Sequence, residues 1–589
     1  MSIVPLVKVT VCGHKNDKAR MLQDLQEMGC LHLIPLTEKG LEAAEHNPAT
    51  EAIEGLRYLT CCPGRRRQVR DARRFDAALV ERRALELKNR IQELSDELDF
   101  LSHRIRDLRP WGEFHLYPRE TIQEYRLWFY KVPRHQMADV EKTNLTWEAV
   151  GEDNRFVFVI VVSKTEPEGM PVARTRTGAR PLSELERRLE EVEIEIEDLQ
   201  AERAGLTKYC DLYKDNLARL EDIEALKSAS QKTYDREPVF VLQGWTPKTR
   251  VPDLEEYVAG NRALIEIEEP GENDKPPTLF QNPPTMQPGE GLVTFYMTPS
   301  YWLWDPSGLV LFSFSIFFAM IISDAGYGSL LGLGLALSWK KMGITASARS
   351  LRRMFAYLIA FSIGWGVLVG SYFGVPPAES SILAKLKILD LTDTPTMMKL
   401  SIIVGAAHIA YANLRNALRQ WPSSALLAPV GWAMMISGGL SLYIGIDKVP
   451  EAAGIGAVGL GALLILFFSG AGEKPLKRLL AGLMSFTGLS KAFGDILSYL
   501  RLFALGLAST SLALAFNDLA KQASQLVEGI GFLLAIVVLL IGHSLNLLLG
   551  IVSGFVHGLR LNLIEFFSWG VKDEGYPFRV FAKREGVQN

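Results

Sequence analysis

Residues 491–516 read KAFGDILSYLRLFALGLASTSLALAF, a long apolar stretch that carries Lys491, Asp495 and Arg501. The next apolar stretch, residues 529–569, would form a helix about 60 Å long, roughly twice the hydrocarbon thickness of a bilayer. A helix of that length has to tilt, bend or project from the membrane. Because an arginine inside a bilayer costs at least ~2.5 kcal/mol, these two stretches predict membrane helices built around a functional site.

Apolar stretches of spanning length recur through the second half of the chain. The second and fourth are marginal in length, but an excess of Lys and Arg falls consistently on one side only if all of them cross, as the positive-inside rule requires. We therefore predict a multi-pass cell-membrane protein whose N-terminal half and C-terminus are cytoplasmic. Its C-terminal all-α membrane domain has eight transmembrane helices, the last two long and tilted, near residues 303–322, 325–339, 354–374, 398–413, 424–445, 453–470, 485–516 and 529–569.

The first half of the chain is rich in charge and has two long stretches with a seam of apolar residues. Residues 80–108 and 182–220 repeat these residues at alternating spacings of three and four, which is typical of a coiled coil. A strand-rich insert separates them, so we expect an antiparallel pair that forms a strut of roughly 60 Å. A compact helical bundle, which needs a third apolar face, is the alternative.

The predicted organisation is multi-domain, with N-terminal cytoplasmic α+β lobes joined by a long antiparallel two-helix coiled coil. Strand-like segments near the N-terminus and again at residues 239–243 and 262–267 predict one lobe built from both. The expected boundaries are a cytoplasmic arm at 1–290 and a membrane ion-translocating domain at 291–589. Within the arm we expect a proximal lobe at 1–45 with 237–270, coiled-coil helices at about 51–109 and 180–235, a distal lobe at 110–179 and a linker at 270–290.

Two polar stripes follow the last two predicted helices. At 100° per residue the seventh helix gathers its polar residues within an arc of roughly 120°, and the eighth within roughly 100°. Two such stripes on neighbouring helices predict a buried aqueous path. The stripes comprise Lys491, Asp495, Ser498, Arg501 and Ser509 on the seventh helix, and His543, Asn546, Gly550, Ser553, His557 and Arg560 on the eighth.

Each of these polar residues could instead have a purely structural role. Arg560, close to Glu565 and to the helix end, fits a snorkelling side chain, whereas Arg501 fits that reading less well. His543 alone fits an interhelical hydrogen bond, but His557 lies one turn before Arg560, where a titrating group can relay protons. Carboxylates in this half are few and peripheral, so we infer that the partner carboxylate comes from another polypeptide.

Several classes of protein are disfavoured. No GxxxxGK[ST] phosphate loop occurs, and we expect no catalytic residue and no cofactor. The net charge of -3 gives no support for nucleic-acid binding, and the five cysteines lack the paired spacing of a metal site. The competing reading is a secondary ion transporter with a cytoplasmic regulatory arm, which predicts an internal repeat that the sequence lacks.

Five stretches resemble the a subunit, also called subunit I, of the V-type and A-type rotary ATPases. The resemblance covers essentially the whole chain, and the two arginine-bearing stretches are its most specific part. The stretches are DILSYLRLFALGLAS (495–509), FVHGLRLNLIEFF (555–567), SDAGYG (323–328), DKPPTLFQN (274–282) and VFVLQGWTPK (239–248).

The resemblance implies a non-catalytic stator that carries ions past a rotating proteolipid c-ring. Each ring subunit would bring one buried carboxylate, which Arg501 and Arg560 would attract while their charge blocks leakage between two offset half-channels. Asp495, Ser498, His557 and Glu565 are the further candidates for lining the path. The implied partners are the proteolipid c-ring, the peripheral stalk subunits, the central-stalk or collar subunits, and membrane lipid.

Two departures from the expected family pattern concern the first two membrane segments. IFFAMII (316–322) is bulkier than the glycine-containing pattern expected before SDAGYG, and WLWDPS (302–307) lacks an acidic residue before the Asp-Pro pair. These differences bear on packing and on the linker more than on function.

Overall fold

The computed structural model forms two compact units, and each is described by itself. It describes residues 2–37, 50–71, 73, 75–114, 124–177, 180–271, 273–445, 450–526, 531–571 and 573–584. The larger unit holds the described residues of Met1–Leu36 and Thr233–Ala582, and the smaller holds those of Thr37–Lys232 and Lys583–Val587. Parts of the predicted distal lobe and of the predicted outer loops lie outside the described residues.

An antiparallel sheet in the larger unit joins the N-terminus to residues after 233. Its order is β2-β7-β1-β8, with β6 on β7, and β1 pairs with both β7 and β8. The predicted return strands are therefore confirmed. Alternate side chains of β1 are buried, as expected for a sheet with one covered face. The elements are β1 (Leu6–His14), α1 (Lys18–Met28), β2 (His32–Ile34), β6 (Tyr234–Arg236), β7 (Val239–Pro247), α8 (Val251–Gly260) and β8 (Leu264–Glu268).

The smaller unit is a helical strut with a three-stranded sheet. The sheet has the antiparallel order β3-β5-β4. Leu94, Leu101 and Ile105 of α4 share an apolar core with Leu185 and Val192 of α6. The elements are α3 (Thr50–Thr60), α4 (Ala77–Leu108), β3 (Arg126–Pro133), α5 (Met137–Glu141), β4 (Trp147–Glu152), β5 (Phe156–Ser163), α6 (Leu182–Leu206) and α7 (Cys210–Lys232).

Three ion pairs give the direction of the α4–α6 packing. As residue numbers rise along α4 they fall along α6, so the two helices run antiparallel, as predicted. The pairs are Arg83 with Glu202 at 2.7 Å, Arg90 with Glu195 at 2.7 Å and Glu97 with Arg188 at 2.8 Å. The pairs are solvent-exposed, so the apolar core contributes more to stability than they do.

The strut helices are shorter than predicted. In place of one helix over residues 51–109, α3 ends at Thr60 and α4 begins at Ala77, and no helix of more than one turn lies in the described part between them. Pro63 and Gly64 follow α3 directly, and both residues disfavour helix continuation. The second predicted helix is divided into α6 and α7 by a 3-10 turn at Thr207–Tyr209.

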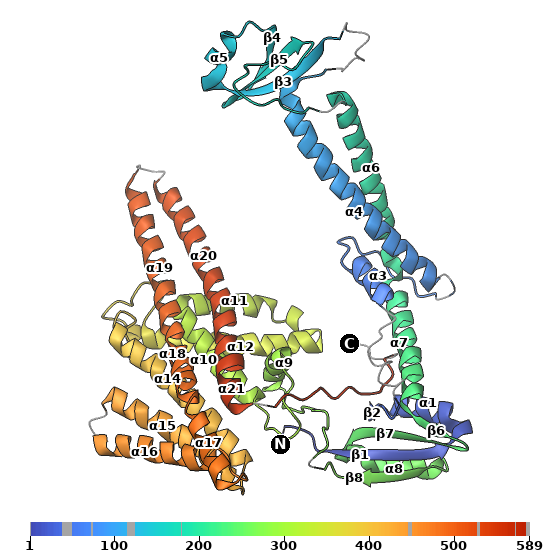
Figure 1. Ribbon diagram of the computed structural model, residues 1–589, viewed down its shortest axis with the longest axis vertical. Helices are drawn as coiled ribbons and strands as arrows, with labels where there is room; N and C mark the ends of the chain where they lie inside the picture. Colours follow the sequence, from blue (N-terminus) through green and yellow to red (C-terminus); the bar gives the residue numbers. More distant parts are fainter. Residues whose placement is uncertain are drawn as a thin grey trace. The chain divides into compact units, whose positions relative to one another are not determined.

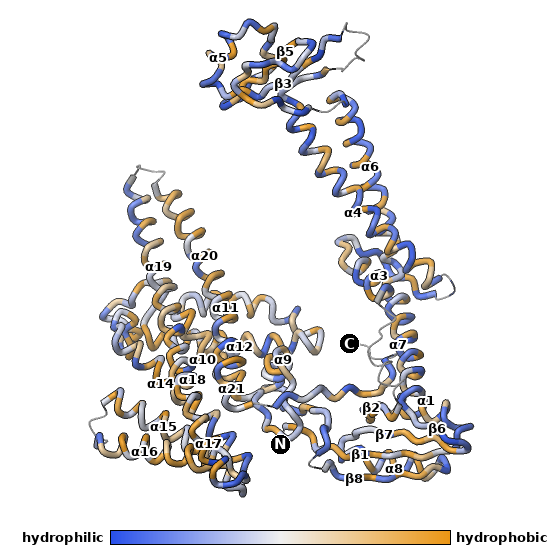
Figure 2. Tube along the Cα trace, in the orientation of Figure 1, coloured by the Kyte–Doolittle hydropathy of each residue, from blue (hydrophilic) through white to orange (hydrophobic). Residues whose placement is uncertain are grey.

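The membrane half is entirely helical apart from its connections (Figure 1). Figure 2 shows that apolar residues predominate along α15, α16 and α20, whereas α4 and α6 are largely hydrophilic. The helices are α9 (Gln287–Tyr296), α10 (Ser307–Ile322), α11 (Ala325–Ser338), α12 (Ala346–Val369), α13 (Ile382–Lys385), α14 (Thr394–Arg419), α15 (Leu427–Ile444), α16 (Glu451–Phe468), α17 (Pro475–Ser485), α18 (Gly488–Leu497), α19 (Leu500–Leu526), α20 (Gly531–Arg560) and α21 (Phe567–Gly570).

Within the described residues, six of the eight predicted segments are long and apolar enough to cross a membrane. The fourth segment, marginal in the sequence, is one of them because α14 extends beyond the predicted ends at both sides. The first two segments, α10 and α11, form shorter apolar helices, so the count of eight is not confirmed. The seventh predicted segment ends at residue 516, but α19 continues to Leu526.

The short helix α10 is the centre of the membrane half. It is apolar on all sides and packs against α9, α12, α19 and α20, so most of its side chains are buried. α10 ends at Ile322, where Ser323 adopts the left-handed conformation, and Asp324 caps the start of α11. The Asp324 carboxylate accepts hydrogen bonds from the Tyr327, Phe373 and Gly374 amides and from the Ser371 hydroxyl.

The pH dependence of the strut tests the ion pairs. The Arg188 and Arg83 guanidinium groups lower the pKa of Glu97 and Glu202, respectively, mainly by hydrogen bonding. Their stabilisation is present above the unfolded glutamate pKa of about 4.3 and is lost as pH falls through the folded value. Hydrogen exchange of α4 and α6 peptides in the full chain should therefore become less protected between about pH 5 and pH 3.

Glu202→Gln should remove part of that pH dependence, by at most ~1 kcal/mol because the Arg83–Glu202 pair is exposed. Glu193→Gln is the matched control, since Glu193 is exposed on α6 and forms no ion pair within the described residues. Identical pH profiles for the two variants would show that the Arg83–Glu202 pair contributes nothing.

Candidate functional site

Arg501 lies at the start of α19, directly after a break in the helical path. α18 ends at Leu497, and α19 begins at Leu500. Tyr499 and Leu502 on either side of Arg501 are fully buried, which holds its backbone in place. The side chain of Arg501 is half-buried, and its Nη1 atom is buried without a hydrogen-bond partner among the described residues. A buried guanidinium nitrogen of this kind calls for an anionic or polar partner.

Arg560 and Glu565 form an ion pair across an unusual helical turn. α20 continues beyond Arg560 as a π-helix, Leu561–Phe566, in which hydrogen bonds join residues five apart. In an α-helix residues 560 and 565 would point roughly 140° apart, but the wider turn brings them together. Arg560 Nε lies 3.6 Å from Glu565 Oε1. Glu565 is 3% exposed, and its Oε2 atom has no partner among the described residues.

The structure brings four of the six predicted site residues into one electrostatic neighbourhood. Arg501 is within interaction range of Arg560 and Glu565, and His557 is within range of both arginines. The Nδ1 atom of His557 is buried and has no hydrogen-bond partner in the described chain. The group therefore has more basic than acidic side chains, and polar atoms on three of its members lack partners.

Asp495 and Ser498, the other two predicted residues, have local structural partners. Asp495 Oδ2 accepts a hydrogen bond of 2.7 Å from Trp569 Nε1, which joins α18 to α21. The Ser498 hydroxyl donates to the Gly494 carbonyl one turn earlier. Asp495 still lies within electrostatic range of Glu565. These contacts place Asp495 beside the arginine group and leave its predicted role in the path as a proposal.

A chain of hydrogen bonds runs along the other half of the α19–α20 hairpin, whose helices lie side by side in Figure 1. His543 bonds Tyr327 OH through Nδ1 at 2.7 Å and Asn517 Oδ1 through Nε2 at 3.1 Å. Asn546 donates to Tyr327 OH at 3.0 Å and accepts from the Ser509 hydroxyl at 3.3 Å. The interhelical hydrogen bond expected for His543 is confirmed.

Sequence reasoning missed Tyr327 and Asn517 as members of this chain. Tyr327 lies within the SDAGYG stretch, which carries only the family resemblance, and Asn517 lies one residue past the end of the seventh predicted segment. A signal was available for Asn517, because it lies eight residues after Ser509 and so falls on the same helical face. Tyr327 comes from α11, far away in sequence, so periodicity does not reveal its contact with α20.

Outward from these residues, α20 exposes an apolar face. The exposed side chains recur at spacings of three and four, and they include Leu545, Leu549, Val552 and Val556. On α19 four of the exposed positions after Arg501 carry small side chains, Ala504, Ala508, Ser511 and Ala515, and Leu514 is exposed among them. Within the described part of the chain no element covers these two faces.

Helices long and apolar enough to cross a membrane, arginines on one hairpin and uncovered faces beside them are the features of a membrane subunit that works with other subunits. An A-type ATP synthase subunit I from Methanocaldococcus jannaschii is 25% identical over 559 residues, 85% of this chain and 80% of that protein. V-type ATP synthase subunit I 1 from Treponema pallidum is 25% identical over 646 residues, which cover 99% of this chain and 100% of that protein. The chain is a homologue of subunit I of the A-type and V-type ATP synthases, consistent with a stator subunit of a rotary ATPase.

Two further comparisons add little. The crystal structure of the cytoplasmic N-terminal domain of subunit I, homolog of subunit a, of V-ATPase is 18% identical and covers 44% of this chain and 99% of that chain. Its TM-score is 0.23, which is too low to inform the fold. No family model matches the chain.

The packing of α20 against α10 generates a stability prediction. A Cβ atom on Gly554 would lie 2.6 Å from the Phe318 ring, whereas one on Gly550 would meet no atom within 4 Å. Gly554→Ala should therefore destabilise the hairpin by about 1–3 kcal/mol through overpacking. Gly550→Ala should have no such cost, because alanine favours the helix.

Thermal unfolding of the purified protein in detergent measures this difference. The Gly554→Ala protein should unfold at a clearly lower temperature than the Gly550→Ala protein. Equal unfolding temperatures would contradict the close packing of α20 on α10.

Proposed function

We propose that the chain is the non-catalytic ion-translocating stator of a rotary ATPase, and that the unpartnered Nη1 atom of Arg501 is the point of action. A ring of proteolipid subunits, each with one buried carboxylate, would supply the missing partner one carboxylate at a time. Attraction to Arg501 favours the ionised carboxylate, so the ring site releases its proton or sodium ion as it reaches the arginine. Nothing is hydrolysed in this subunit.

The uncovered faces of the hairpin support contact with such a ring. The small side chains on α19, Ala504, Ala508, Ser511 and Ala515, let another helix approach closely, as small residues do between membrane helices. Arg501 lies three residues before the first of them, at one end of this surface. The apolar face of α20 beside it would border the same partner or lipid.

Two polar routes would lead toward Arg501 from opposite ends of the hairpin. The chain of Asn517, His543, Tyr327, Asn546 and Ser509 approaches from the connection between α19 and α20, which lies outside the cell in the predicted topology. From the cytoplasmic end the candidates are Glu565 and His557, with Asp495 and Ser498 alongside. These routes would be the two half-channels, and the positive charge of the arginines would separate them.

The remaining assignments complete this proposal. We assign residues 1–290 to a cytoplasmic arm whose antiparallel α4–α6 pair is a coiled coil, and residues 291–589 to the membrane domain. The arm would bind peripheral stalk subunits and contact the central-stalk or collar subunits, so that torque turns the ring and not this chain. With α10 and α11 counted as short spans, eight segments place the N-terminal half and the C-terminus in the cytoplasm.

Replacement of Arg501 tests the proposal. In vesicles that contain the intact complex, Arg501→Ala should abolish ATP-driven ion uptake at matched assembly, because the ring carboxylate loses its partner. Lys477→Gln is the control, since Lys477 is exposed and lies on α17, away from the helix that carries Arg501. Continued uptake by Arg501→Ala would overturn the role given to Arg501.

Tyr327→Phe tests the outer route. The variant keeps the aromatic ring of Tyr327 but loses the hydroxyl that joins His543 to Asn546. The initial rate of ion uptake should therefore fall severalfold. ATP hydrolysis by the uncoupled complex should be unchanged. Tyr443→Phe, an exposed tyrosine on α15, is the matched control. An unchanged rate in Tyr327→Phe would show that ions enter or leave by another path.

A further inference from the structure

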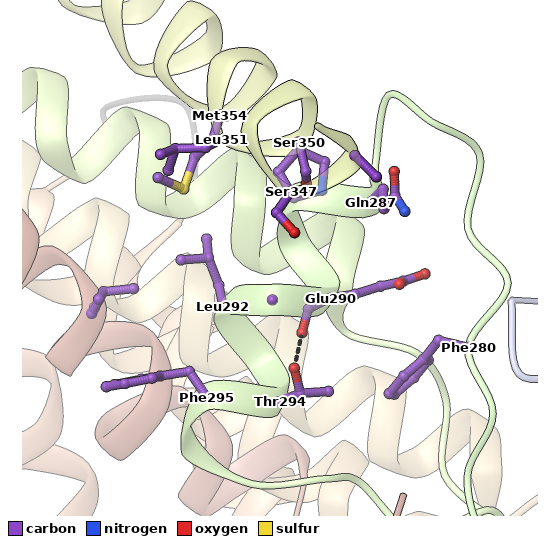
Figure 3. A pocket seen from close by; sticks show the side chains of 14 residues that line it. Phe280, Gln287, Glu290, Leu292, Thr294, Phe295, Ser347, Ser350, Leu351 and Met354 are labelled. Atoms are coloured by element: carbon purple, nitrogen blue, oxygen red, sulfur yellow. Dashed lines mark hydrogen bonds between the residues drawn. The ribbon is translucent and has the colours of Figure 1, made fainter. Parts of the chain in front are cut away.

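A groove with a volume of about 660 Å³ lies between α9 and the first turns of α12. Figure 3 shows the side chains that line it facing one another from the two helices. Leu292, Phe295, Leu351 and Met354 gather toward one end, and Gln287, Glu290 and Ser347 toward the other. Leu559 of α20 adds a further apolar wall. The size is that of a binding site for one amphiphilic molecule.

The walls of the groove are held together independently of any occupant. Arg353 Nη1 donates to the Pro284 carbonyl at 2.6 Å and to Gln287 Oε1 at 3.4 Å, which ties α12 to the start of α9. On the other side of α9, Gly289 lies so close to the Ser307 carbonyl that no Cβ atom fits between them. The groove is therefore preformed, and an occupant would not bear the cost of ordering it.

Basic residues adjoin the groove without lining it, and Arg353 contacts Gln287 at its polar end. Five basic residues occur between residues 340 and 353, and no acidic residue occurs from 325 to 378. Arg349 and Arg352 donate to the neutral carbonyls of Gly343, Ile344 and Trp339, so their charge is not cancelled. Glu290 is the acid that lines the groove, and its Oε1 atom accepts a hydrogen bond of 3.0 Å from the Asn282 amide. The five basic residues are Lys340, Lys341, Arg349, Arg352 and Arg353.

Large apolar side chains stand in the open beside these charges. Phe295 is 82% exposed and Ile344 is 74% exposed. Exposed aromatic and aliphatic residues next to Lys and Arg are characteristic of the membrane–water interface on the cytoplasmic side. This places the groove at the level where lipid headgroups meet their acyl chains.

We propose that the groove binds one anionic phospholipid of the cytoplasmic leaflet. An acyl chain would lie along Leu351, Met354 and Leu559, and the phosphate would face the hydroxyls of Ser347 and Ser350 with Lys340 and Lys341 nearby. Leu559 directly precedes Arg560, so the lipid would pack against the cytoplasmic end of α20. The charge selects the lipid, because acyl contact alone does not distinguish headgroups.

Photolabelling of the intact complex tests the proposal. The complex is reconstituted in phosphatidylcholine vesicles with a trace of phosphatidylglycerol that carries a diazirine in its acyl chain, and labelled peptides are mapped. Labelling should concentrate on residues 287–296 and 346–354. In the double variant Lys340→Gln with Lys341→Gln, labelling should fall by about fivefold for each lysine removed. This is the loss of affinity expected when one basic residue no longer attracts an anionic membrane lipid.

Controls separate the groove from other sources of label. Ser350→Trp should fill the groove and remove the label, whereas Leu337→Trp, at an exposed position of α11, and Lys385→Gln, at an exposed position of α13, should retain it. If Ser350→Trp fails to assemble, the double lysine variant alone decides, since both lysines are exposed. Equal labelling by the matching phosphatidylcholine probe, or competition by soluble glycerol 3-phosphate, would overturn the proposal.

Discussion

The membrane half is organised around the cost of keeping the Arg501 charge away from water. A guanidinium group inside a bilayer needs an anion, a hydrogen-bond acceptor or water, and nothing in the described chain fills that need for the Nη1 atom. The rest of the fold holds this residue in place. Tyr499 and Leu502 bury the backbone on either side, and α19 packs on the central helix α10. Under the proposed function, such a setting would keep the charge available to the passing carboxylate of a ring subunit.

The site lies at irregular turns of the backbone, which set the directions of its polar side chains. The break between α18 and α19 ends one helix just before Arg501, and the π-helix after Arg560 changes the direction in which Glu565 points. Irregular backbone in a membrane is tolerated only where protein or a polar cavity covers it. Both irregular turns are packed by buried neighbours, Tyr499 at the first and Phe566 at the second. The polar residues are thus aimed by the backbone and not by side-chain flexibility.

Much of the fold and of the candidate site could be predicted from the sequence. The contacts between distant segments and the irregular turns could not. Arg501 and Arg560 stood out because charge in an apolar helix is costly, and the strand pairing at the N-terminus followed from alternation. Periodicity along one helix could not show that Tyr327 meets His543, since the contact joins distant segments. Nor does it reveal a π-turn, which changes the register by a single residue. The first predicted segment is four residues longer than α10, which begins only at Ser307 after Pro306, whereas α11 has nearly its predicted bounds.

Glu565 gives the two arginines different roles. Its carboxylate lies 3.6 Å from Arg560 Nε and is almost fully buried, so the chain itself supplies a partner for Arg560. Two positive charges against one negative charge leave the group with one charge in excess. A ring site that delivers a single carboxylate would balance this excess only while it stands at Arg501, and the balance would be lost again when it moves on. Under the proposed function, Arg501 would be the arginine that meets the ring, and Arg560 with Glu565 would keep the neighbourhood from attracting a second carboxylate at the same time.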